Sequence, residues 1–311
     1  MRARIALLAL ALHGCSGDLP PVGVVDKLRL LAVRAEPPEP APGETVALDA
    51  LIVEPLVQPA DGGGGANPAA PSAVWLACPS VADASGTLTP CPPSSPPLAQ
   101  TGASHATYVP AAAGDFTITL TVTDGAQTIV ALKRLPVRDP AAANGAPPNH
   151  NPSLAAFTLA DASGDAGFPL DGDDSLTDGG ANYAPSPPKS RTRFQLTAVA
   201  ADGAAEMEPA LDAAGAPGGL QYESLSVAWF TTAGTIDASR TFFAPPGCDT
   251  QAACPQLPPA PDAHATWSAP TVEEQAASAP GAGEQRGTIA FWAVLRDDRG
   301  GVDWLAGYAR P

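Results

Sequence analysis

The stretch FTITLTVTDG, residues 116–125, alternates apolar and hydroxyl side chains almost without a break. Phe, Ile, Leu and Val fall on one face and the threonines on the other, which is the period of two that is typical of a strand with one buried face. Asp124 and Gly125 give a hairpin-turn signal, and residues 127–137 then return as a second apolar run. The stretch therefore predicts an antiparallel hairpin packed on a core.

Short strands of the same kind occur along the whole chain, whereas helical periodicity is almost absent. The chain has 37 Pro and 30 Gly among 311 residues, a composition that favours turns and short strands over long helices. The turn at residues 297–301, DDRGG, is a second hairpin signal. The remaining expected strands are residues 28–33, 44–53, 73–78, 193–200, 225–230, 288–295 and 302–309.

Two short motifs indicate an internal repeat. HATYVP begins at His105, and HATWSAP begins at His264. Each follows a compact strand that contains a tryptophan: Trp75 precedes the first motif by 30 residues, and Trp229 precedes the second by 35. The two halves of the chain are therefore expected to share one fold.

The strands and turn signals predict an all-β protein made of two β-sandwich domains. The chain is long enough for two ordinary cores. Residues 139–151, DPAAANGAPPNHN, have the Pro, Gly and Asn content of a short, partly stiff linker. The expected domains are residues 26–138 and residues 152–311, each with a tryptophan on an early central strand.

Three stretches of the second half resemble motifs of bacterial immunoglobulin-like domains, of the kind found in uncharacterised surface lipoproteins. They are residues 226–234, 267–270 and 294–301. The resemblance covers most of the chain after its first residues, and it implies two tandem immunoglobulin-like β-sandwiches. One feature departs from the antibody pattern: no cysteine pair is placed to link the two sheets beside the tryptophan.

The first residues have the order of a secretory signal peptide. Arg2 and Arg4 precede an apolar run at residues 5–12, which is too short to span a bilayer. LHGC, residues 12–15, resembles the bacterial lipobox, although His13 departs from its usual small residue. The resemblance implies cleavage after residue 14, lipidation of Cys15 and a tether over residues 15–25. The alternative is an ordinary signal peptide with an incidental cysteine.

The resemblance to the lipobox also implies a location in the cell. Ser16 follows the lipidated cysteine, and by resemblance to known sorting rules this favours the outer membrane of a Gram-negative bacterium. The protein is then expected in the cell envelope, held to the membrane through its lipid.

Four cysteines remain once Cys15 is assigned to the lipid. Four cysteines allow three pairings, and we expect the two local ones because each pair is close in sequence and surrounded by turn residues. The pairs are Cys78 with Cys91 and Cys248 with Cys254. A zinc site is disfavoured because neither spacing contains a C-x-x-C unit.

The charge excludes nucleic acid as a partner class. Lys and Arg number 16 against 32 Asp and Glu, which gives a net charge of −16. Such a surface repels phosphate backbones, and no basic stripe offsets it. We expect the membrane, reached through the lipid anchor, and an envelope protein or a glycan as partners.

No motif in the sequence predicts catalysis. There is no G-x-S-x-G elbow, H-E-x-x-H pair or glycine-rich phosphate loop. Beyond the signal peptide the histidines are His105, His150 and His264, and two of them begin the repeated motif, so we interpret them as structural. We expect no catalytic residues and no obligatory cofactor.

Two features are candidates for ligand binding. The acidic stretch at residues 161–180 could bind Ca²⁺ weakly through Asp171, Asp173, Asp174 and Asp178, although it lacks the register of a calcium loop. Trp304 is the one tryptophan expected to be exposed, and it could stack on a glycan. The other four tryptophans are expected in the cores: Trp75, Trp229, Trp267 and Trp292.

The sequence thus favours a non-enzymatic, lipid-anchored envelope lipoprotein that serves as a structural or protein-interaction module. The alternative is a Ca²⁺-dependent adhesin or a glycan-binding surface protein, and a third hypothesis is an accessory domain pair of a secreted enzyme system.

Overall fold

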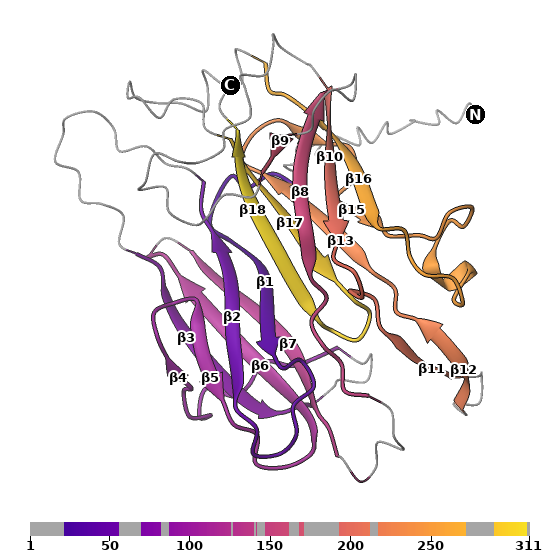
Figure 1. Ribbon diagram of the computed structural model, residues 1–311. Helices are drawn as coiled ribbons and strands as arrows, with labels where there is room; N and C mark the ends of the chain where they lie inside the picture. The colour runs from indigo at the N-terminus through magenta and orange to yellow at the C-terminus, as the bar shows by residue number, and fades with distance from the viewer. Residues whose placement is uncertain are drawn as a thin grey trace, which may run out of the picture.

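The computed structural model describes residues 22–55, 70–81, 87–125, 127–139, 141, 147–161, 168–170, 193–211, 217–271 and 289–309. The described chain is all-β, and every pair of named strands is antiparallel, as the alternating sequence predicts (Figure 1). Its one helical element among these residues is a 3-10 turn, Gln251–Ala253. No helix in this part of the chain has the length and apolar character needed to cross a membrane.

The first half consists of two facing sheets. One has the order β1-β2-β5-β4 and the other the order β3-β6-β7. The opening stretch of the sequence forms β6 and returns through the expected turn into β7, with Thr123 opposite Thr128. The strands are β1 (Arg29–Glu36), β2 (Val46–Val53), β3 (Ser72–Pro79), β4 (Ala99–Gln100), β5 (His105–Tyr108), β6 (Gly114–Thr123) and β7 (Thr128–Val137).

The second half has the same plan with additions. One sheet has the order β14-β16-β10-β8-β9 and the other the order β15-β13-β17-β18, while β11 and β12 form a separate hairpin that projects from the body (Figure 1). The strands are β8 (Leu154–Asp161), β9 (Phe168–Pro169), β10 (Arg193–Ala200), β11 (Met207–Leu211), β12 (Pro217–Tyr222), β13 (Ser226–Thr231), β14 (Thr235–Ile236), β15 (Arg240–Phe242), β16 (Asp262–Ser268), β17 (Ile289–Arg296) and β18 (Val302–Ala309).

Each half encloses one apolar core between its two sheets. Trp75 is fully buried in the first core, and Trp229 and Trp267 are fully buried in the second. Their buried indole N–H groups have hydrogen-bond partners. The indole N–H of Trp75 donates to the carbonyl oxygen of Ala103 at 3.1 Å, and the indole N–H of Trp267 donates to the carbonyl oxygen of Ala233 at 2.9 Å. The expectation that the tryptophans anchor the cores is confirmed, because these rings fill the space between the sheets while their polar edges keep a partner.

The repeated HAT motif occupies the same position in both halves. His105 begins β5 and lies opposite Asp49 of β2, with 2.7 Å between Nδ1 and the carboxylate. His264 on β16 lies opposite Thr197 of β10, with 3.0 Å between Nδ1 and the hydroxyl. Both rings are exposed and contact the neighbouring strand, so the motif marks equivalent strand pairs.

A third apolar cluster joins the two halves, and we call it the seam. Val25, Leu31 and Ala32 of the first half pack against Trp292 and Val294 on the outer face of the second half. β1 accordingly lies beside β18 (Figure 1). The seam explains why Trp292 is buried although it faces away from the core of its own half.

The first described residues also reach across to the second half. The N–H of Val25 donates to the carbonyl oxygen of Thr231 at 2.8 Å, and the N–H of Thr231 donates to that of Gly23 at 2.8 Å. Residues 23–25 therefore lie beside β13 of the second half before the chain enters β1 of the first. The seam and this segment therefore join the two halves in addition to the linker.

Candidate functional site

The turn between β17 and β18 is the centre of a charged site at the junction of the halves. Asp297 is buried, and its Oδ1 accepts hydrogen bonds from the N–H of Arg299 at 2.9 Å and from the N–H of Gly301 at 2.7 Å. A Cβ at Gly301 would collide with the Asp297 carboxylate and would lie 3.0 Å from the carbonyl oxygen of His150. The glycine thus lets the linker pass directly over the turn.

Arg299 extends from this turn into a group of carboxylates. Its guanidinium lies 3.0 Å from Glu39 of the β1–β2 connection and 3.0 Å from Glu223, which follows β12. Glu206 and Glu208, which lie before and within β11, are 3.7 and 3.9 Å away. One cation therefore links three segments that are distant in sequence. We call Arg299, these four glutamates and Asp297 the Arg299 cluster.

Burial controls the protonation of the cluster. Glu223 is fully buried, and this desolvation, together with the nearby charge of Asp297, raises its pKa to about 8 despite the opposing effect of Arg299. Burial also raises the pKa of Asp297, against the hydrogen bonds that favour its ionised form. Burial lowers the pKa of Arg299, but attraction to Glu223 and Glu39 outweighs it, and the net shift is upward.

The linker binds the cluster through two consecutive residues. The backbone N–H of Asn149 donates to a carboxylate oxygen of Glu39 at 2.7 Å. His150 lies with its Nδ1 2.6 Å from Glu206. The linker is therefore attached to a carboxylate from each half, rather than spanning them freely.

Asn151 continues this attachment. Its side-chain N–H₂ donates to the carbonyl oxygen of Ala35 at 2.7 Å, and its Oδ1 accepts from the N–H of Val302 at 2.8 Å. The amide thus bridges the end of β1 and the start of β18. Because a side-chain amide can donate and accept at once, a single residue fixes the register between the halves.

Lys133 and Arg296 add two cations that donate hydrogen bonds to backbone carbonyls. Nζ of Lys133 on β7 donates to the carbonyl oxygen of Gly300 at 2.7 Å, and Arg296 donates to that of Leu31 at 2.6 Å. Burial lowers the pKa of Lys133 to about 8 and also lowers the pKa of Arg296. Both bonds cross from one half to the other, so they belong to the junction.

Trp304 lies at the other side of the junction and is half-buried rather than exposed as we expected. The guanidinium of Arg34 stands 4.7 Å from the centroid of its ring. Arg34 is held there by Asp49 at 3.1 Å and Asp303 at 3.2 Å. The ring packs against the seam with a cation over its face. The partial burial of Trp304 could not be predicted from the sequence, because the seam that covers it joins segments distant in sequence.

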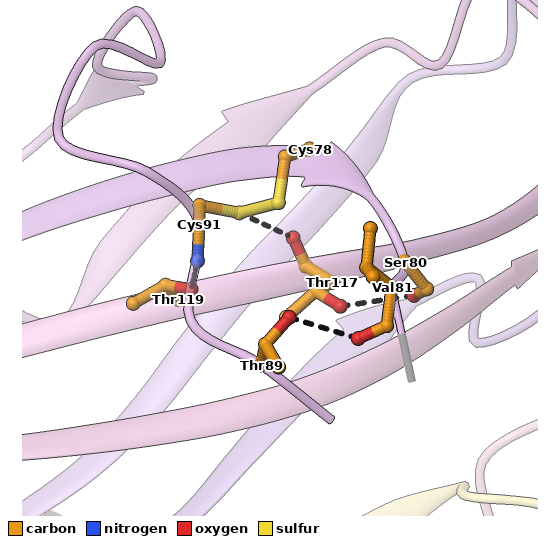
Figure 2. The surroundings of a disulfide bond; sticks show 7 residues. All are labelled: Cys78, Ser80, Val81, Thr89, Cys91, Thr117 and Thr119. Carbon is orange, nitrogen blue, oxygen red and sulfur yellow. Dashed lines mark hydrogen bonds between the residues drawn. A yellow bond between two sulfur atoms is a disulfide. The ribbon is translucent and has the colours of Figure 1, made fainter. Parts of the chain in front are cut away.

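Both expected disulfides are present, Cys78–Cys91 and Cys248–Cys254. Figure 2 shows the first, which closes a loop over the outer face of β6. The N–H of Cys91 donates to the hydroxyl of Thr119 at 2.9 Å, and the hydroxyls of Ser80 and Thr117 lie 2.9 Å apart (Figure 2). The loop therefore buries two of the threonines on the outer face of β6.

The sulfur of Cys91 also lies 3.1 Å from the carbonyl oxygen of Thr117 (Figure 2). A disulfide sulfur carries no proton, so this is a close contact and not a donated hydrogen bond. The contacts of the loop are structural and leave no free thiol in it.

The other candidate residues lie outside the described part of the chain. These are Cys15 and the four aspartates, Asp171, Asp173, Asp174 and Asp178. Within the described ranges no group of three or more His, Cys, Asp or Glu residues is placed to hold a metal ion.

Sequence reasoning missed the Arg299 cluster. It interpreted residues 297–301 as a hairpin turn and as part of a stretch that resembles immunoglobulin-like domains, and the four glutamates come from other parts of the chain. The available signal was weak: an arginine follows two aspartates in a hairpin turn, where a solvated side chain is the ordinary expectation. Only the packing of the halves brings the glutamates to it.

Comparisons with known proteins give no assignment. No protein-family model matches the chain, and no curated protein matches it. Among solved structures, three N-terminal domains of the highly immunogenic outer capsid protein (Hoc) of bacteriophage RB49 are 9% identical with a TM-score of 0.18, over 91% of this chain and 58% of that one.

Two further structures are similarly distant. A Salmonella alpha-2-macroglobulin is 11% identical with a TM-score of 0.22, over 94% of this chain and 15% of that one. Latent PorU from Porphyromonas gingivalis is 10% identical with a TM-score of 0.20, over 92% of this chain and 24% of that one. The chain spans less than two thirds of the length of each of the three proteins, and TM-scores at this level carry no argument about function.

Proposed function

We propose that this chain is a non-enzymatic, lipid-anchored envelope protein built from two tandem immunoglobulin-like sandwiches, which serves as a structural or protein-interaction module. The observation that carries the proposal is the strand order. In the first half, β1-β2-β5-β4 facing β3-β6-β7 matches the ABED and CFG sheets of a constant-type immunoglobulin domain.

The second half repeats this order. β8, β10, β16 and β14 take the places of A, B, E and D, and β13, β17 and β18 take those of C, F and G. β15 extends the second sheet beyond β13, and the β11–β12 hairpin is an insertion between B and C. The shared plan supports two domains at residues 26–138 and 152–311, with a linker at 139–151.

The joined halves support a structural role. The seam, the linker and residues 23–25 hold the sandwiches together, as a module that presents a surface at a fixed distance from its anchor requires. A flexible pair of domains would lack these three connections.

The proposed anchor also suits this arrangement. Cys15 precedes Val22 by seven residues, and seven residues of extended chain reach at most about 25 Å. Because residues 23–25 pair with β13, a lipid on Cys15 would hold the junction, rather than one remote end, close to the membrane surface.

The test is to replace Cys15 by Ser in the full-length protein and to fractionate the cells. We expect the wild-type protein in the membrane fraction, with incorporation of a labelled fatty acid, and the Cys15→Ser variant without label and absent from that fraction. Ser16→Ala, which leaves the cysteine in place, is the control and should remain membrane-bound. Retention of unlabelled Cys15→Ser in the membrane fraction would contradict the anchor.

A further inference from the structure

The charges of the Arg299 cluster do not balance. Four glutamates lie within 3.9 Å of one guanidinium, which is shared at 3.0 Å between Glu39 and Glu223, and the buried carboxyl of Asp297 lies in the same turn as Arg299. The other glutamates are about one fifth exposed, whereas Glu223 is fully buried. An unbalanced buried carboxylate is costly, and taking up a proton removes that cost.

The bonds of Glu223 show how a proton is accommodated. One carboxyl oxygen accepts from Arg299 at 3.0 Å, and the other accepts from the N–H of Glu206 at 3.3 Å, a long bond. A carboxylic acid keeps the first bond through its carbonyl oxygen and gives up only the second, long one. The geometry is therefore compatible with a neutral Glu223.

A second buried polar group, the side-chain amide of Asn149, lies beside Asp297 in the same cluster. Asn149 is buried, and its Oδ1 has no hydrogen-bond partner among the described residues, while its Nδ2 lies 3.4 Å from the Asp297 carboxylate. Turning the amide over would place Oδ1 beside Asp297, where a protonated carboxyl could donate to it. The turned amide would leave its N–H₂ group where Oδ1 now lies without a partner, so this contact bears on how Asp297 holds a proton and leaves the argument for Glu223 to its own burial and bonds.

We propose that the Arg299 cluster is a proton-dependent clamp between the two halves, which is closed when Glu223 is protonated and loosens when Glu223 ionises. Loosening would separate the β17–β18 turn from the linker and from the β1–β2 connection, while the seam remains packed. The proposal is independent of the lipid anchor and of the envelope location.

The charged groups around Glu223 come from every element at the junction, and the directions of their shifts determine the pH window. The pKa of Glu223 is raised from an ordinary 4.5 to about 8, so its contribution favours the closed clamp at low pH and is lost as the pH rises between these values. Asp297 acts in the same direction. The pKa of Lys133 is lowered from 10.5 to about 8, so its contribution favours closure as the pH rises through that higher range. The other charged neighbours are Glu39, His150, Glu206, Glu208, Arg296, Asp298 and Arg299.

These shifts give the size of the effect. Between pH 6 and pH 8 the Glu223 shift increases the ratio of open to closed clamp by about fiftyfold, and the Lys133 shift halves that, which leaves about 25-fold. The closed clamp is weakest relative to the open one near pH 8.

Limited proteolysis of the linker with subtilisin measures this opening, because residues 147–151 are bonded to both halves when the clamp is closed. Cleavage rates at pH 6 and pH 8 are normalised to a peptide substrate. We expect linker cleavage of the wild type to rise by about 25-fold, and that of Glu223→Gln, which mimics the protonated acid, to change by twofold or less. Glu208→Gln, which changes a partly exposed member of the cluster, is the matched control and should behave as the wild type.

A spectroscopic measurement completes the test. An infrared difference spectrum between pH 6 and pH 9 should show the carbonyl band of a buried carboxylic acid lost near pH 8, and the band should be absent from Glu223→Gln. Equal pH dependence of linker cleavage in wild type and Glu223→Gln, or no such band in the wild type at pH 6, would overturn the clamp.

Discussion

Replacing Arg299 by Met tests how much the Arg299 cluster contributes to the free energy of unfolding. The substitution keeps an unbranched side chain of similar length and removes the cation that Glu39 and Glu223 share. The structure offers a matched control in Arg134, which makes two bonds to Asp115, at 3.0 and 2.8 Å, on the surface of the β6–β7 hairpin. Both arginines pair with carboxylates at similar distances, but Arg134 is 63% exposed and Arg299 is 20% exposed.

The expected loss follows from the partners. A hydrogen bond to a charged group contributes about 1.5–3 kcal/mol, which applies to Arg299 and a protonated Glu223, and the half-buried pair with Glu39 adds about 0.5–1 kcal/mol. Arg299→Met should therefore lower the free energy of unfolding by about 3 kcal/mol at pH 7. At pH 9, Glu223 is ionised in the wild type, and the variant loses about 1.4 kcal/mol more because it must hold the proton one pH unit above a pKa of about 8.

Urea denaturation followed by tryptophan fluorescence measures both values. Arg134→Met should lose less than 1 kcal/mol at either pH, since exposed pairs contribute little. In a Glu223→Gln background the loss caused by Arg299→Met should be the same at pH 7 and at pH 9, because an amide at position 223 has no proton to hold as the pH rises. If Arg299→Met and Arg134→Met lose the same small amount at pH 7 and at pH 9, the cluster does not stabilise the junction and the reasoning fails.

Two further predictions concern the loops and the turn. Changing both members of the Cys78–Cys91 pair to Ser should lower the free energy of unfolding by about 3 kcal/mol through loop entropy, and opening the shorter Cys248–Cys254 loop in the same way should lower it by about 2.4 kcal/mol. Chemical denaturation of the two variants checks this order, and a larger loss for the shorter loop would contradict it. Gly301→Ala should disrupt the linker, because its Cβ would overlap the Asp297 carboxylate, whereas Gly300→Ala has open space and carries only the strain of its positive φ, about 1–2 kcal/mol. Linker proteolysis that is faster in Gly300→Ala than in Gly301→Ala would refute this.

Most strands could be predicted from the sequence because their signal is local. The alternation at residues 116–123 survives in β6, and the DG turn after it joins β6 to β7 as expected. Three of the four tryptophans expected in the cores, Trp75, Trp229 and Trp267, lie there, and both local cysteine pairs formed as predicted, since each depends on a few neighbouring residues; Trp292 instead lies in the seam. Small elements such as β4, β9 and β14 have only two residues each and leave no periodic signal.

The junction could not be predicted for the opposite reason. Trp304 and Trp292 both lie in alternating strands, and nothing in their local pattern says that β1 will cover the outer face of their sheet. Arg299 likewise has its partners at positions 39, 206, 208 and 223, which no spacing rule connects. Contacts between two folded halves depend on their relative orientation, and the sequence of either half alone does not contain it.

The seam and the Arg299 cluster contribute differently to the joining of the halves. Burial of Val25, Leu31 and Trp292 is favourable but non-directional, so the seam alone would tolerate small rotations of one half against the other. The bonds of Asn151 and Arg299 are directional and fix one orientation. Weakening the cluster should therefore loosen the junction without separating the halves, because the seam and the pairing of residues 23–25 with β13 remain. Arg299→Met should then become more sensitive to linker proteolysis while its radius of gyration stays close to that of the wild type, and this combination distinguishes a clamp from the sole attachment between the halves.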